Sequence, residues 1–211
     1  MNHAQRLAHA RDVLHRAETA SGLSKTEDKE GWQTPEVLST VLPALTPGVL
    51  AVVGSSTILL ALAGHASSQG AWVALVGLPL IGWGAAVDHG LDLTRTAHIP
   101  APGARAAEVL TALADGFDIL VVGDLALTAR DQRALAQRVR TRDTTILAAE
   151  WSTGASVLRV ESAGSSGYDA GVGHLASTRF TVSSGSRHAT CLWTAHGLTS
   201  APRLLRAVAS C

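Results

Sequence analysis

The sequence predicts an α/β protein with a mostly parallel central sheet, flanking helices and an antiparallel β extension toward its C-terminal end. Mostly apolar runs alternate with segments of helical periodicity, which is typical of repeated β–α units with right-handed crossovers. One run, WVALVG, is apolar at every position, as expected for a strand covered on both faces. After Trp151 the pattern changes to period-two segments joined by glycine and serine, which indicates antiparallel strands. The apolar runs are residues 49–53, 72–77, 117–122 and 144–149.

The composition excludes several classes of function. The 211 residues suit one large domain with small appendages. Lys+Arg and Asp+Glu both number 17, so no net charge favours nucleic acid or a membrane surface. Two cysteines, Cys191 and Cys211, make neither a disulfide framework nor a metal cluster, and the histidines show no ligand spacing. We therefore expect a cytoplasmic protein that holds no metal and no cofactor.

The N-terminal segment has the pattern of an amphipathic helix. Leu7 and Leu14 fall on one stripe with two alanines, while the arginines fall elsewhere. The segment is charged throughout, so we expect no signal peptide. The expected divisions of the chain are this helix over residues 1–22, a linker over 23–31, a core over 32–199 and a tail helix over 200–211.

Two apolar segments, residues 49–64 and 71–87, leave a transmembrane hairpin as an alternative. Each is shorter than the roughly 20 apolar residues that a bilayer span needs. The first is interrupted by Gly-Ser-Ser-Thr and the second by three glycines and a proline. We favour the strands and helices of a folded core.

The core begins with a helix signal at GWQTPE. Thr34 has the side chain of an N-cap, and Pro35 suits the first helical position, which predicts a short helix over residues 35–42. The segment TAHIP adds a short strand to the apolar runs. Helical periodicity predicts further helices over residues 57–69, 82–89, 103–116 and 128–141.

The last third of the core predicts antiparallel strands over residues 157–161, 177–185 and 188–197. Ser184-Gly185-Ser186 is a candidate hairpin turn between the last two. The composition of residues 163–173 predicts a glycine-serine loop.

The stretch PGVLAVVGSST has the order of a phosphate-binding loop, in which a strand and a small-residue turn lead into a helix. Backbone N–H groups of such a turn face an anion. The turn Gly54-Ser55-Ser56-Thr57 lacks the lysine of such a loop and is several residues too short. Thr57 could stand where a Mg²⁺-binding hydroxyl sits. The competing interpretation is a tight turn that Ser55 or Ser56 caps.

The order of elements over residues 32–197 resembles the RecA core. HGLDLTRTAHIPAPG is similar to the RecA segment that leads into a strand ending in a proline loop, DGFDILVVGD resembles its Walker B strand, and LASTRFTVSSGSR resembles its C-terminal hairpin. GWQTPEVLSTVLP, PGVLAVVGSSTILLALAGHAS and WVALVGLP extend the likeness to actinobacterial ImuA-type proteins over nearly the whole chain. That resemblance implies a role in DNA-damage-induced translesion synthesis beside ImuB, an error-prone C-family polymerase and, as a further candidate, RecA.

Four features of RecA are missing when the motifs are compared position by position. The phosphate loop has no lysine, and Val76-Gly77-Leu78-Pro79 supplies no carboxylate where RecA orients its attacking water. The Walker B acid falls on Gly123, and Asp124 follows one residue late, where a strand side chain faces the opposite way. Both DNA-contacting loops look deleted. These departures predict a protein that does not hydrolyse ATP, and they suggest that Asp124 caps the next turn.

Three surfaces are candidates for binding. Arg130, Arg133 and Arg140 fall roughly on one side of helix 128–141 and could contact DNA phosphates, although such a run is often a solvated face. The N-terminal helix, through Leu7 and Leu14, either packs on its own domain or docks on another chain. The tail, through Leu204, Leu205 and Val208, suits a helix-in-groove contact or is an inert end.

Smaller candidates favour structural roles. We expect Trp151 and Trp193 to pack in or around the core, His174 to lie in a loop, and Cys191 to be a small buried side chain of a strand. The sequence thus predicts a non-catalytic RecA-like adaptor. A divergent nucleotide-binding ATPase and a RecA-like inhibitor of cell division remain as alternatives.

Overall fold

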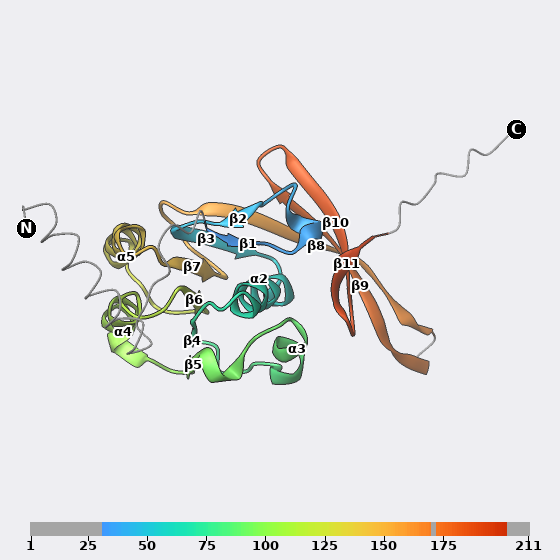
Figure 1. The fold of residues 1–211 in the computed structure, drawn as a ribbon, viewed down its shortest axis with the longest axis horizontal. Helices are drawn as coiled ribbons and strands as arrows, with labels where there is room; N and C mark the ends of the chain where they lie inside the picture. The colour runs from blue at the N-terminus through green and yellow to red at the C-terminus, as the bar shows by residue number, and fades with distance from the viewer. Residues whose placement is uncertain (1–30, 170–171, 202–211) are drawn as a thin grey trace, which may run out of the picture. The chain divides into compact units, whose positions relative to one another are not determined.

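A computed structural model describes residues 31–169 and 172–201, which belong to one compact unit. Its main strands are β3 (Gly48–Val53), β4 (Val73–Val76), β5 (Thr96–Ile99), β6 (Ile119–Val122), β7 (Thr145–Ala148), β8 (Ser156–Asp169), β9 (Val172–Ser184), β10 (Arg187–Thr194) and β11 (Gly197–Ser200). In the described part of the chain these nine strands form one sheet in the order β11-β10-β9-β8-β3-β7-β6-β4-β5 (Figure 1).

The sheet is parallel from β8 to β5 and antiparallel from β8 to β11. The α-helices are α2 (Ser56–Ser68), α3 (Trp83–Asp88), α4 (Ala106–Leu113) and α5 (Ala129–Thr141). Helix α2 lies on one side of the parallel strands, and α4 and α5 lie on the other (Figure 1). This arrangement confirms the expected fold class.

The central parallel strands β3, β4, β6 and β7 are buried because both of their faces are covered. Side chains of a strand alternate between faces, so each strand contributes to two hydrophobic layers. Leu50 and Val52 of β3 pack in the layer that contains α2, while Val49 packs in the layer that contains α4 and α5. The continuous apolar runs of the sequence are therefore the two-sided strands that they predict.

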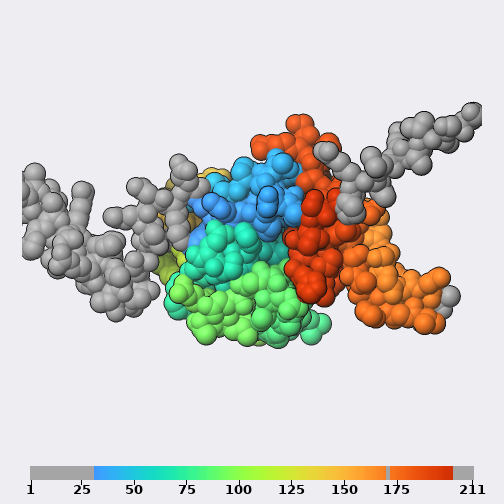
Figure 2. Space-filling view, turned by 45° about the vertical axis from the view of Figure 1, so that its right-hand side comes forward, coloured from blue at the N-terminus to red at the C-terminus, as the bar shows by residue number. Residues whose placement is uncertain are grey.

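The expected helix over residues 35–42 is wrong. The segment forms one 3-10 turn, η1 (Glu36–Leu38), between two short strands, β1 (Trp32–Gln33) and β2 (Ala44–Leu45), which pair antiparallel. Thr34 does not cap a helix, because its hydroxyl donates across the loop to the carbonyl of Leu42. This hydrogen bond joins the two ends of the segment from Thr34 to Leu42, and the loop that it closes holds a single helical turn. Strands β10 and β11 lie beside the N-terminal end of the described chain (Figure 2).

Two further predictions on element boundaries are corrected. The helix expected over residues 103–116 divides into a 3-10 turn, η3 (Gly103–Arg105), and α4, which ends at Leu113. The strand expected over residues 188–197 divides into β10 and β11. Strand β11 includes Ser200, the first residue assigned to the tail helix.

The glycine-serine loop predicted over residues 163–173 is also wrong, since β8 and β9 run through this region as a two-stranded ribbon (Figure 1). The side chains of the outer ribbon are exposed, and hydroxyl pairs join its strands. These pairs are Ser165–Thr178 at 3.2 Å and Ser166–Ser177 at 2.8 Å between the oxygens. His174 consequently lies in a strand and not in a loop. The hairpin turn at Gly185, between β9 and β10, is confirmed.

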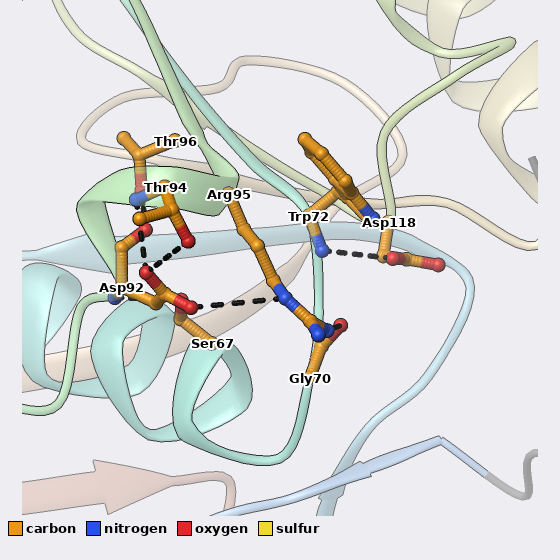
Figure 3. A network of polar contacts seen from close by, with 8 residues as sticks. All are labelled: Ser67, Gly70, Trp72, Asp92, Thr94, Arg95, Thr96 and Asp118. Atoms are coloured by element: carbon orange, nitrogen blue, oxygen red, sulfur yellow. Dashed lines mark hydrogen bonds and ion pairs between the residues drawn. The ribbon is translucent and has the colours of Figure 1, made fainter. Parts of the chain in front are cut away.

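A polar network fixes the segment HGLDLTRT against the C-terminal end of α2 (Figure 3). Asp92 Oδ1 accepts hydrogen bonds from Thr94 N at 2.9 Å and Thr94 Oγ1 at 2.7 Å, and its own N–H donates to Ser67 Oγ at 3.0 Å. The hydrogen bond from the Thr94 hydroxyl is the main cause of the lowered pKa of Asp92. Arg95 donates to the carbonyl of Gly70 at 2.9 Å. The segment HGLDLTRT, which resembles RecA, thus has a structural role, since these hydrogen bonds hold it against α2.

No helix within the described ranges is long and apolar enough to cross a membrane. The two segments of the hairpin alternative instead form β3, α2, β4 and α3 of the folded core.

Candidate functional site

The carboxyl ends of β3, β4, β6 and β7 meet at one edge of the sheet because these strands are parallel. Ligands of open α/β sheets bind at this edge. The resemblance to RecA places its phosphate loop and both of its carboxylates here. The geometry of this edge therefore decides whether the residues fit a nucleotide with Mg²⁺.

The turn between β3 and α2 is too short to surround a phosphate. Strand β3 ends at Val53 and α2 begins at Ser56, so only Gly54 and Ser55 lie between them. Ser55 is the N-cap, since its Oγ accepts a hydrogen bond from Ile58 N at 3.3 Å. The predicted capped turn is confirmed, with Ser55 as the cap.

Gly54 is required by the neighbouring strand. Its φ is 100°, in the left-handed region that favours glycine. A Cβ at this position would lie 2.1 Å from the carbonyl oxygen of Val160 in β8. The close approach of β8 thus explains the glycine without any phosphate.

Gly123 and Gly77, which follow β6 and β4 where the RecA resemblance expects carboxylates, have close neighbours. A Cβ at Gly123 would lie 2.1 Å from the carbonyl oxygen of Gly77, and one at Gly77 would lie 2.4 Å from Cδ2 of Leu125. Gly123 N also donates to the carbonyl of Val76 at 2.9 Å, which holds the two strand ends together. Gly123 has no room for a side chain, and the left-handed φ of 71° at Gly77 disfavours one there, so the residues at this edge do not fit the Mg²⁺-nucleotide site of RecA.

Asp124 does not cap the turn that follows it. That cap is made by Thr128, whose Oγ1 accepts a hydrogen bond from Asp131 N at 3.2 Å while Asp131 Oδ2 accepts one from Thr128 N at 3.1 Å. Asp124 is exposed, and its carboxylate has no hydrogen bond or ion pair with any described residue. The prediction that it caps the turn is wrong because a complete capping box already serves α5.

Asp124 instead borders a hollow of about 370 Å³ beyond the ends of β3, β6 and β7. Glu150 and Trp151, which follow β7, line it too. Gln132 of α5 closes one wall, and its Oε1 accepts hydrogen bonds from Ser152 N at 3.0 Å and Ser152 Oγ at 2.9 Å. The remaining lining residues are Val53, Val122, Gly123, Leu125 and Leu127.

The arginines predicted to contact DNA are exposed on α5. Arg140 is fixed in place, because its Nη2 donates to the carbonyl of Gly154 at 3.3 Å. Arg130 and Arg133 have no ion pair with any described residue. Arg138 of the same helix and Arg142, which caps its C-terminal end, are paired with Asp115 at 2.6 and 2.9 Å.

Three of the smaller candidates have the structural roles that the sequence predicts. Cys191 is fully buried in β10, and burial raises the pKa of its thiol to about 11. Trp193 packs on the core and donates from Nε1 to His89 Nε2 at 3.0 Å. Trp151 packs against the layer of α4 and α5, and its Nε1 is enclosed without a partner among the described residues.

Metal ligands do not gather in the described ranges, where no group of three or more His, Cys, Asp or Glu side chains could hold an ion. The predicted partner-binding residues Leu7, Leu14, Leu204, Leu205 and Val208 lie outside the described residues.

The sequence profile of one family, the MT3502 N-terminal domain, matches residues 39–153, more than half of the chain. The chain belongs to the MT3502 N-terminal domain family. The matched segment contains the capped turn at Ser55, the contact between Gly77 and Gly123, and most of the hollow.

One relative of this MT3502 N-terminal domain protein is the uncharacterized protein Rv3395c of Mycobacterium tuberculosis (strain ATCC 25618 / H37Rv). The two are 40% identical over 108 residues, which are 50% of this chain and 52% of that protein. The chain thus spans about half the length of the curated relative that it matches. Among solved structures, the crystal structure of the RadB recombinase matches with a TM-score of 0.57 and 15% identity, over 79% of this chain and 97% of that chain. At this identity the likeness shows the fold alone, which is RecA-like.

Sequence reasoning missed three polar residues of the hollow in this member of the MT3502 N-terminal domain family: Gln132, Glu150 and Ser152. Gln132 had a detectable signal, because it lies three and four residues before Leu135 and Ala136 on the apolar side of α5. A polar side chain on that face suggests a buried partner. The contact with Ser152 spans 20 residues of sequence and has no local pattern.

Proposed function

We propose that this protein is a non-catalytic RecA-like adaptor that supports DNA-damage-induced mutagenesis and translesion synthesis by binding other proteins. The proposed partners are ImuB and the error-prone C-family polymerase, with RecA as a further candidate. The observation that supports the proposal is the contact between Gly77 and Gly123, because a Cβ on Gly123 would lie 2.1 Å from the Gly77 carbonyl oxygen. A fold that keeps its core and lacks its catalytic groups is well suited to binding.

The partners follow from the likeness to ImuA-type proteins in the quoted segments. The segments GWQTPEVLSTVLP and PGVLAVVGSST lie around η1 and β3, where they build the core layer that contains α2. The likeness therefore concerns residues that form the scaffold, and surface residues must provide the contacts with partners. We propose that two segments provide such contacts, the predicted N-terminal helix over residues 1–22 and the predicted tail over residues 200–211.

Direct contact with DNA is proposed to be weak or indirect. Arg130 and Arg133 are exposed on α5 without an ion pair or side-chain hydrogen bond in the described part of the chain, whereas Arg140 donates to the carbonyl of Gly154. Two phosphate contacts would give binding to single strands with a salt slope of only about −1.4. Such weak binding could help to hold the adaptor near DNA, but it would not bring the adaptor to DNA by itself.

Co-purification tests the proposal most simply. The full tagged chain is co-expressed with ImuB and the C-family polymerase of the same organism, and we expect ImuB to be retained through a high-salt wash. Chains lacking residues 1–22 or 200–211 then locate the contact, and the unchanged retention of ImuB by either deletion excludes that segment. Failure of the full chain to retain ImuB, the polymerase or RecA would contradict the adaptor function.

A divergent nucleotide-binding protein is the second candidate, and the strand-turn-helix order at residues 53–57 on a RecA-like fold favours it. It predicts that ATP protects the turn at residues 54–57 from proteolysis or hydrogen exchange. The adaptor predicts no protection there, because the Ser55 cap and the Val160 contact already occupy the turn.

A further inference from the structure

We propose that the hollow at the ends of β3, β6 and β7 binds an arginine or lysine side chain that a partner protein presents in a short apolar segment. This inference rests on the proposed adaptor function and names the site through which it acts. At about 370 Å³ the hollow lies within the range of ligand sites, about 300–1,000 Å³.

The charge of the hollow favours a cation. Asp124 follows β6 and Glu150 follows the neighbouring parallel strand β7, so both carboxylates stand at one edge of the sheet. Both are exposed, and neither has an ion pair or hydrogen bond with a described residue. The lining contains no Lys, Arg or His. Two such carboxylates attract an ammonium or guanidinium group and repel the phosphates of a nucleotide or of DNA.

A buried amide at the same place lacks half of its hydrogen bonds. Gln132 is only 9% exposed, and its Oε1 is held by both Ser152 donors. Because a backbone N–H can only donate, the contact with Ser152 N identifies this atom as the oxygen. Gln132 lines the hollow, and its Nε2 has no partner among the described residues but is accessible to solvent, since it is not one of the enclosed unpaired atoms. Its two N–H groups suit a carbonyl oxygen of a ligand.

The remaining lining suits the apolar part of the same ligand. Leu125, Leu127 and the indole of Trp151 offer carbon surface to the methylene stem of a long side chain. A guanidinium can also stack on an indole. A peptide that contains an arginine supplies a cation for the carboxylates, a stem for the leucines and a backbone carbonyl for Gln132. No phosphate ligand meets all three requirements.

The test uses the full ¹⁵N-labelled chain and two synthetic tripeptides, acetyl-Leu-Arg-Leu-amide and acetyl-Leu-Glu-Leu-amide. NMR titrations follow the indole N–H of Trp151 and the carboxamide of Gln132, with the other tryptophans as internal references. We expect the arginine peptide to shift both signals saturably and the glutamate peptide to shift neither. The double variant Asp124→Asn/Glu150→Gln should bind the arginine peptide about tenfold more weakly or worse.

The matched control is the variant Glu161→Gln/Asp169→Asn, which removes two exposed carboxylates of β8 that do not line the hollow. It has the same net charge as the first variant and should bind like the natural chain. Equal affinity of the two variants, or equal shifts with both peptides, would overturn the proposed site. The adaptor function fails separately, if the full chain retains none of the proposed partners while the arginine peptide still binds.

Discussion

Gly123 lies against the backbone of Gly77 so closely that a methyl group on Gly123 would stand 2.1 Å from the Gly77 carbonyl oxygen. The two glycines directly follow the neighbouring strands β6 and β4, and the RecA resemblance expects one acidic side chain at Gly123 and another near the end of β4. The contact fills the space at the carboxyl ends of β4 and β6, where an ATPase needs room for charged side chains. The first prediction below tests this contact, three others test the packing and stability of the fold, and a fifth tests the binding of ATP.

The variant Gly123→Ala should lower the free energy of unfolding by about 1–3 kcal/mol, because the added methyl group forces the ends of β4 and β6 apart. Urea denaturation measures the change. Gly116→Ala is the matched control, since a Cβ there meets nothing within 4 Å. Equal stability of the two variants would show that the strand ends separate easily and leave room for a carboxylate.

Replacing Ser55 by alanine should cost about 1 kcal/mol of stability through loss of the N-cap of α2. The control is Ser56→Ala, which changes the first helical residue without removing the hydrogen bond to Ile58 N. Thermal or urea denaturation distinguishes the two. A larger effect at Ser56 would contradict the assignment of the cap.

Cys191 should react slowly with iodoacetamide in the native protein. Burial raises its pKa from 9.0 to about 11, which leaves about a hundredfold less thiolate at pH 8. The experiment uses a Cys211→Ser background, so that one thiol is counted. We expect fast alkylation only in denaturant, and native alkylation at the rate of a free peptide thiol would argue against a buried β10.

Stability should fall as the pH drops below about 6.5, the ordinary pKa of histidine. Burial lowers the pKa of His89 in the folded state, with a smaller opposing effect of Asp88, so the unfolded chain takes up the proton more readily. The stabilising contribution is therefore complete above the unfolded pKa and is lost as the pH falls through the folded one. Protonation also removes the acceptor for Trp193 Nε1.

His65, whose pKa burial also lowers, should act in the same direction. Urea denaturation at several pH values between 7.5 and 5 checks the effect, with His89→Gln and His65→Gln/His89→Gln as variants. Each replacement should flatten the pH dependence further. If the stability of the double variant depends on pH as that of the natural chain does, groups other than His65 and His89 cause the effect.

The sequence predicted the parallel core well because its signals there are local. Residues 72–77 are apolar at every position and residues 144–149 are apolar after two threonines, and both appear as buried strands of nearly those bounds. The helix at 128–141 appears as α5, with Leu135 and Val139 buried as its periodicity predicts. The capped turn at Ser55 was likewise visible in the order of its residues.

Two of the errors fall where hydrogen bonds between residues apart in the sequence fix the backbone, which local patterns do not reveal. The ribbon of β8 and β9 contains glycine and serine, and its outer part is held by backbone ladders and hydroxyl pairs such as Ser166–Ser177. It therefore has no alternation of apolar residues to detect. The loop around Thr34 closes through a hydrogen bond to Leu42, which outweighs the helix signal of Thr-Pro.

The candidate site was predicted only in part. The absence of a lysine and of carboxylates is visible in the sequence, but the reason is a contact between Gly77 and Gly123, 46 residues apart. Asp124 was recognised as displaced, while its place beside Glu150 depends on the pairing of β6 with β7. Long-range packing of this kind is not encoded in local spacing.

A calorimetric titration of the full chain with ATP and Mg²⁺ tests the central claim most directly. The short turn at Ser55, the closed strand ends at Gly77 and Gly123, and the anionic hollow at Asp124 all predict no saturable binding. Tight binding of ATP that depends on Mg²⁺ would contradict the account and establish a nucleotide site on this fold.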